Sequence, residues 1–230
     1  MDDASMSTLG QFLELSLPAP DLAASLDFWQ RLGLAEVRVN DIRPAGYAAV
    51  TDGQVVIGLY ATGLVEPALT FVKPDLARHA RALVDAGTEL EFLKAGDDQF
   101  NEAGLRTPDG HLVLLLEAPT FSVTDDDPPA PVIGRCTGLA LATGSVAETR
   151  SFFESAGFLG VEDEDDDAVL VTAEGISLML RSAAGHRGVE LHFEPAGPWR
   201  EQLEARGIAT RPHAGTRLVT SPEGLRLLLK

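Results

Sequence analysis

The chain has 230 residues, of which 45% are hydrophobic and 23% are charged, as is ordinary for a globular protein. Its formal net charge of −17 argues against nucleic acids and anionic membrane surfaces as partners. No apolar run approaches the ~20 residues that a membrane helix needs. The acidic start lacks the basic and then apolar pattern of a signal peptide, so we expect a cytoplasmic protein.

The first half of the chain predicts strands interrupted by two helices. The first helix lies between Asp21, a good N-cap residue, and Gly33, which accepts the left-handed conformation at a helix end. Alternating apolar residues indicate the strands, and the turn around Gly53 indicates a hairpin between two of them. The expected strands are residues 12–17, 47–51, 55–60, 69–72 and 111–117, and the second helix is residues 76–86.

The second half repeats this order. Residues 138–158 echo residues 14–34 without a gap, and the turn Thr107-Pro108-Asp109-Gly110 recurs as Ser221-Pro222-Glu223-Gly224. Ser145 and Glu148 have the spacing of a helix capping box. The repeat predicts further strands at residues 168–172, 176–181, 189–193 and 225–229, and a last helix between Pro198 and Gly207.

A segment rich in proline and aspartate separates the two copies and indicates an extended linker. We therefore divide the chain into a flexible tail at residues 1–8, a first module at 9–121, a linker at 122–132 and a second module at 133–230. A repeat of this length is a duplicated module rather than a short solenoid unit.

These motifs resemble those of the vicinal oxygen chelate superfamily, which includes glyoxalases, bleomycin-resistance proteins and extradiol dioxygenases. The stretches that carry the resemblance are Pro20-Asp21-Leu22, Phe28-Trp29, Leu32-Gly33-Leu34 and Thr107-Pro108-Asp109-Gly110-His111. The resemblance implies an α+β fold of two tandem βαβββ modules. Their strands would pair as a half-barrel sheet that encloses a cleft, with the helices outside. In enzymes of the family, His, Glu or Gln side chains hold a divalent metal in that cleft.

The positions of the family's metal ligands are mostly occupied here by residues that cannot coordinate a metal. They fall on Glu14, Ala68 and Leu114 in the first copy and on Gly138, Glu190 and Leu228 in the second. A catalytic site usually takes three protein ligands. We therefore expect no metal or other cofactor. A variant site that combines Glu14, Glu190 and His192 is the alternative.

Strand alternation predicts which side chains line the cleft, because every second residue of a strand faces the same side. We expect this lining to be small and apolar with a few polar groups, as binding sites commonly are. The alternative without ligand binding is that Glu190 and His192 only pair with each other and that Arg226 only pairs with a carboxylate. The candidate ligand-binding residues are Glu14, Ser16, Thr70, Leu112, Leu114, Glu190, His192 and Arg226.

The leading hypothesis is a protein that sequesters an apolar or aromatic small molecule, cationic or neutral, without a metal. The rivals are a metal-dependent lyase, isomerase or dioxygenase, a metal-free enzyme in which Glu14 or Glu190 moves a proton, and a purely structural or regulatory partner. Because the chain carries both modules, a monomer or a homodimer is expected.

Overall fold

A computed structural model describes residues 7–37, 46–85, 87–96, 100–117, 128–162, 168–173, 175–182 and 188–230. Most of the expected tail and the first part of the expected linker lie outside these residues. Among the residues that are described, no helix has the length and apolar character needed to cross a membrane.

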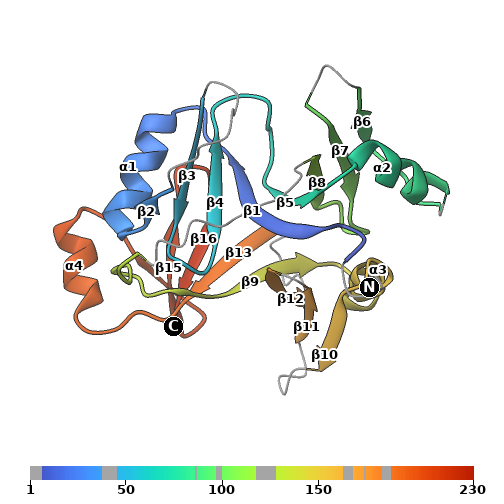
Figure 1. The fold of residues 1–230 in the computed structure, drawn as a ribbon. Helices are drawn as coiled ribbons and strands as arrows, with labels where there is room; N and C mark the ends of the chain where they lie inside the picture. The colour runs from blue at the N-terminus through green and yellow to red at the C-terminus, as the bar shows by residue number, and fades with distance from the viewer. Residues whose placement is uncertain are drawn as a thin grey trace. The chain divides into compact units, whose positions relative to one another are not determined.

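The described residues form four helices and sixteen strands, in which the order strand, helix, strand, strand, strand occurs four times (Figure 1). Each copy of the sequence repeat therefore holds this order twice. In the first copy the elements are β1 (Gln11–Pro18), α1 (Leu22–Leu32), β2 (Ala35–Glu36), β3 (Tyr47–Thr51), β4 (Val56–Tyr60), β5 (Ala68–Lys73), α2 (Leu76–Asp85), β6 (Phe92–Lys94), β7 (Glu102–Arg106) and β8 (Leu112–Glu117). In the second they are β9 (Cys136–Thr143), α3 (Val146–Ser155), β10 (Leu159–Glu162), β11 (Ala168–Ala173), β12 (Ile176–Ser182), β13 (Gly188–Phe193), α4 (Trp199–Ala205), β14 (Arg211–His213), β15 (Thr216–Thr220) and β16 (Arg226–Leu229).

The two copies have the same strand order. It is β2-β3-β4-β1-β5-β8-β7-β6 in the first sheet and β10-β11-β12-β9-β13-β16-β15-β14 in the second. Neither order closes on itself, so both sheets are open. The pairs β1–β4, β5–β8 and β13–β16 are parallel, and the hairpins, such as β3–β4 and β15–β16, are antiparallel. The predicted α+β class and the tandem repeat are confirmed.

The predicted helix ends are also confirmed. The side chain of Asp21 accepts a hydrogen bond from the backbone N–H of Ala24, and Gly33 ends α1 in the left-handed conformation with φ of 98°. In the second copy the Ser145 hydroxyl accepts from the backbone N–H of Glu148. These side chains satisfy N–H groups that the first helical turn leaves without a partner.

Six strands were not predicted from the sequence: β2, β6, β7, β10, β14 and β15. Three of them have only two or three residues, too few for an alternating pattern to be recognised. The hairpin between β14 and β15 turns at Ala214 and Gly215, which both have positive φ, of 43° and 79°. Such a turn is typically signalled by Asn-Gly or Asp-Gly, and Ala-Gly carries no such signal.

The described residues form two compact units, and each unit draws on both copies. The first unit takes residues up to Glu14, from Ala68 to Val123 and from Ala142 to Gly188. The second unit takes those from Leu15 to Pro67, from Thr124 to Leu141 and from Val189 onward.

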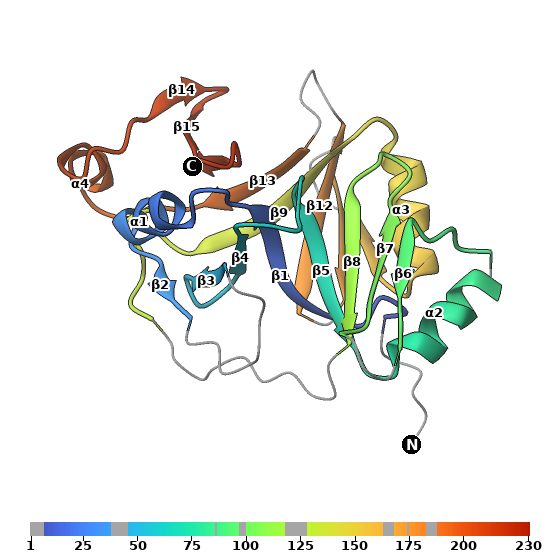
Figure 2. The same ribbon diagram turned by 90° about the horizontal axis from the view of Figure 1, so that it is seen from above.

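Within the first unit, α2 packs on β7 and β8, and α3 packs on β10, β11 and β12 (Figures 1 and 2). The rings of Phe12, Phe71, Phe158 and Phe153 form a chain of edge-on and tilted contacts in its core. Within the second unit, α1 packs on β3 and β4, and Trp29 is fully buried. The leucines at alternate positions of β1 and β9 are all buried: Leu13, Leu15, Leu17, Leu139 and Leu141.

Candidate ligand-binding site

Three of the predicted site residues lie together on β13 and β16 in the second unit. The parallel register pairs Glu190 with Arg226 and His192 with Leu228. Because side chains alternate along a strand, these four share one face of the sheet. The sequence pattern thus predicted their juxtaposition, and the strand register explains it.

An ion pair occupies the centre of this cluster. The Nε of Arg226 lies 3.1 Å from Oε1 of Glu190, and the two side chains are only 16% and 14% exposed. His213, at the end of β14, places its Nε2 2.7 Å from Nη2 of Arg226. Since a guanidinium only donates, this ring nitrogen accepts, and the proton of a neutral His213 is on Nδ1. Sequence reasoning missed His213 because it missed the β14–β15 hairpin.

His192 is buried, with 1% of its surface exposed. Its Nε2 lies 3.9 Å from Oε2 of Glu190, which is too far for a hydrogen bond. Neither ring nitrogen has a hydrogen-bond partner among the residues that the structure describes. A buried polar group without a partner costs about 1–3 kcal/mol, so it calls for an explanation.

The other predicted residues are spread over β1, β5 and β8. Glu14, Ser16 and Thr70 are fully buried, and each has partners within the structure. Thr70 pairs with Leu114 in the β5–β8 register. Leu112 is buried and Leu114 is half-buried. Glu14 and Thr70 belong to the first unit, and Ser16 belongs to the second.

The donor set does not fit the metal that the family resemblance implies. The terminal-strand ligand positions are occupied by Leu114 and Leu228, and the Glu190 carboxylate is already paired with Arg226. Across the described ranges, no group of three or more His, Cys, Asp or Glu side chains is placed to hold a metal ion. Glu14 is buried and has partners of its own. Glu190 and His192 alone are one ligand short of a usual catalytic set.

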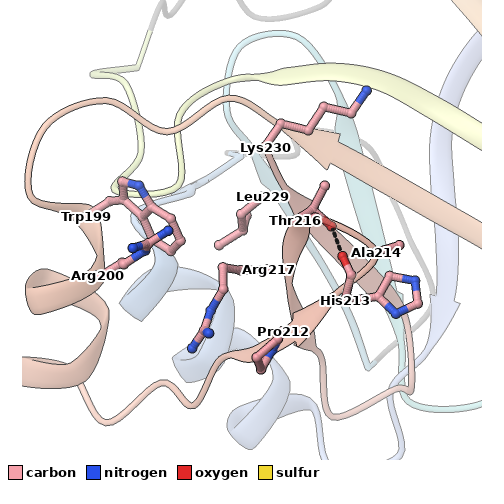
Figure 3. Close-up of a pocket in the computed structure, with 10 residues that line it drawn as sticks. Trp199, Arg200, Pro212, His213, Ala214, Thr216, Arg217, Leu229 and Lys230 are labelled. Atoms are coloured by element: carbon pink, nitrogen blue, oxygen red, sulfur yellow. Dashed lines mark hydrogen bonds between the residues drawn. The ribbon is translucent and has the colours of Figure 1, made fainter.

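A separate pocket of about 470 Å³ lies between the start of α4, the β14–β15 hairpin and the end of β16 (Figure 3). Pro212, Arg217 and Leu229 are in register across these strands and so share a face. This face is opposite to that of Arg226 and Leu228. None of the predicted site residues lines the pocket. Its lining includes Trp199, Arg200, Pro212, Arg217, Leu229 and Lys230.

Comparison with known families gives one match by sequence. The family model described as the glyoxalase/bleomycin resistance protein/dioxygenase superfamily matches residues 9–127, about half of the chain. None of the curated proteins compared by sequence matches the chain significantly.

Several solved structures have the same fold. A catechol 2,3-dioxygenase is 16% identical with a TM-score of 0.65, and the alignment covers 97% of this chain and 87% of that one. For homoprotocatechuate 2,3-dioxygenase from Arthrobacter globiformis the identity is 13%, the TM-score 0.66 and the coverage 100% and 82%. For BphC, a halotolerant catechol dioxygenase, the values are 14%, 0.59, and 97% and 86%. At such low identity the likeness concerns the fold.

Proposed function

This chain belongs to the glyoxalase/bleomycin resistance protein/dioxygenase superfamily, and we propose that it binds an apolar or aromatic small molecule on the β13–β16 face without a metal. The polar contact of this ligand is His192, and its apolar body rests on Leu228. Glu190 and Arg226 flank it as a neutralised pair. Because their charges cancel, the site has no strong preference for a cationic ligand over a neutral one.

The observation that carries the proposal is the pairing of His192 with Leu228. His192 brings a buried imidazole whose nitrogens have no partner in the described part of the chain. Beside it on the neighbouring strand, Leu228 places an apolar side chain where the family resemblance implies a metal ligand. An organic molecule with one polar group fits this pair, because its polar group can hydrogen-bond to His192 while its apolar part contacts Leu228.

The test is thermal unfolding of the purified protein with a panel of aromatic cations and neutral aromatics, and separately with divalent metals before and after chelation. We expect at least one aromatic compound to raise the Tm and the metals to leave it unchanged. A rise with a divalent metal and none with any organic compound would overturn the proposal.

Two substitutions at one position sharpen this test. His192→Leu removes the polar contact and should weaken binding of the selected compound at least tenfold. His192→Gln keeps a donor and an acceptor and should retain most of the affinity. Without ligand, His192→Leu should be at least as stable as the unmodified protein, because it removes a buried group with no hydrogen-bond partner among the described residues. A large loss of stability would mean that His192 serves the fold instead.

The second candidate function is a metal-dependent lyase, isomerase or dioxygenase that holds its metal with Glu190 and His192. The proximity of Glu190 and His192, 3.9 Å apart, favours it. Metal titration followed by elemental analysis separates the two candidates. A bound metal that is lost in both Glu190→Ala and His192→Leu would establish the variant site.

A further inference from the structure

Cationic side chains gather in the pocket between α4, the β14–β15 hairpin and β16. Arg200, Arg217 and Lys230 line it, and no carboxylate side chain is among the lining residues that the structure describes (Figure 3). The chain has 35 acidic residues against 18 lysines and arginines. The charged side chains among the lining residues are therefore all cationic, contrary to the composition of the whole protein.

Arg217 is fixed in place but not neutralised. Its Nε and Nη2 both donate to the hydroxyl of Thr210, at 3.2 and 2.8 Å, and Nη2 also donates to the Thr210 carbonyl at 3.2 Å. These acceptors are uncharged, and Nη1 has no partner within the described residues. A guanidinium that is positioned by neutral groups keeps its charge and a donor for an anion.

The pocket also offers flat apolar surface. The guanidinium carbon of Arg200 lies over the Trp199 ring, 5.0 Å from its centroid. No carboxylate within the described ranges pairs with Arg200. The Leu229 side chain points into the space beside Trp199, and Pro212 lies beside Arg217 (Figure 3). Aromatic and aliphatic surfaces of this kind bury a planar ring, and the volume of about 470 Å³ is in the range of small-molecule sites.

We propose that this pocket is a second binding site, which takes a small aromatic carboxylate. The carboxylate group is held by Arg217 and Arg200, and the ring lies between Trp199 and Leu229. The site is separate from the His192 site, because Leu229 and Arg226 face opposite sides of β16. His213 is among the lining residues, but its imidazole points away from Leu229 (Figure 3). Its Nε2 accepts a hydrogen bond from Arg226.

Isothermal titration with four probes tests the chemistry of this site. We expect 2-naphthoate to bind with an affinity that falls as salt is raised, since the attraction between charges is screened. The neutral 2-naphthamide, acetate and inorganic phosphate should each bind at least tenfold more weakly. If 2-naphthamide equals 2-naphthoate, no anion site exists. If phosphate equals 2-naphthoate, the apolar part of the assignment is wrong.

Charge-matched substitutions test its location. Arg217→Gln and Arg200→Gln should each weaken 2-naphthoate binding at least tenfold. Arg200 is exposed, so its replacement should leave the fold intact. Arg211→Gln removes the same charge from the same hairpin outside the pocket lining and should change the affinity less than twofold. His192→Leu should also leave it unchanged. Equal losses in Arg211→Gln, or a loss in His192→Leu, would overturn this location, whereas the His192 proposal stands or falls with its own panel.

Discussion

At the scale of single residues, equivalent turns of the two copies have different surroundings. The carboxylate of Asp109 accepts hydrogen bonds from the backbone N–H of Gly144, at 2.6 Å, and from the hydroxyl of Thr149, and so supports the start of α3. Glu223 occupies the same place in the second copy. Both of its carboxylate oxygens are buried, and within the described structure neither has a hydrogen-bond partner. The repeat therefore keeps the acidic residue but not its structural role.

Replacing Asp109 and Glu223 by alanine should affect the free energy of unfolding differently. Asp109→Ala removes two bonds to a charged acceptor and should lower the free energy of unfolding by about 2 kcal/mol. Glu223→Ala removes an unsatisfied buried carboxylate, so it should leave stability unchanged or raise it. Urea denaturation of both variants measures this difference. Similar losses in the two variants would show that Glu223 has a stabilising role after all.

His79 makes stability depend on pH. Burial lowers the pKa of His79 below its usual value of about 6.5, and the nearby Lys73 lowers it further, while a hydrogen bond to the Thr8 carbonyl opposes the shift. The unfolded chain then takes up a proton at a higher pH than the folded protein does. The contribution of neutral His79 to the free energy of unfolding is complete above the pKa of the unfolded chain. It is lost as the pH falls below that pKa toward the lower pKa of the folded protein.

We therefore expect the free energy of unfolding to decrease between pH 7 and pH 5, and to decrease less in His79→Gln, in which residue 79 no longer titrates. Chemical denaturation at several pH values measures both slopes. Parallel slopes for the two proteins would contradict the assignment to His79.

At the scale of elements, the entry to the first strand of each copy requires a glycine. Gly10 and Gly134 precede β1 and β9, have positive φ, and donate their N–H groups to Ser7 and Pro131. A Cβ at either position would lie within 3.0 Å of a carbonyl oxygen, of Val72 or Glu194. Only glycine combines this conformation with this close approach.

Alanine at Gly10 or Gly134 should therefore lower the free energy of unfolding by about 3 kcal/mol or more, from backbone strain together with a steric clash. Gly110 is the matched control. It has a φ of 86°, but no atom lies within 4 Å of the position of its Cβ. Gly110→Ala should cost about 1 kcal/mol, from strain alone. Thermal and urea unfolding of the three variants give the comparison, and equal costs would exclude the clash.

The elements also show what could be predicted from the sequence. The ends of α1 could be predicted because Asp21 and Gly33 interact with backbone groups only a few residues away in the chain. The alternation of side chains along a strand is a local rule that also holds in the folded protein. It placed Glu190, His192 and Arg226 on one face. Trp199, Arg217 and His213 were not assigned to any site, because their juxtaposition depends on the β14–β15 hairpin, whose Ala-Gly turn has no recognisable signal. The ion pair of Glu190 depends on register, which composition does not encode.

At the scale of the whole molecule, the sequence repeat and the compact units divide the chain differently. In the second unit, Arg31 of the first copy donates to the Arg206 carbonyl at 3.1 Å, and Arg206 donates to the Arg31 carbonyl at 2.8 Å. In the first unit, the Ser7 hydroxyl donates to the Ala156 carbonyl at 2.9 Å. Each unit is therefore held together by hydrogen bonds between segments of both copies.

Cutting the chain between the copies should not separate them. A protease site placed between Val123 and Thr124 should give a nicked protein that elutes from a sizing column as the intact chain does, because each unit keeps contributions from both fragments. Its Tm should fall on dilution, since unfolding now releases two molecules. Each fragment produced alone should lack a cooperative transition, because it holds only part of each unit. Fragments that separate on the column and unfold cooperatively alone would show that each copy folds independently.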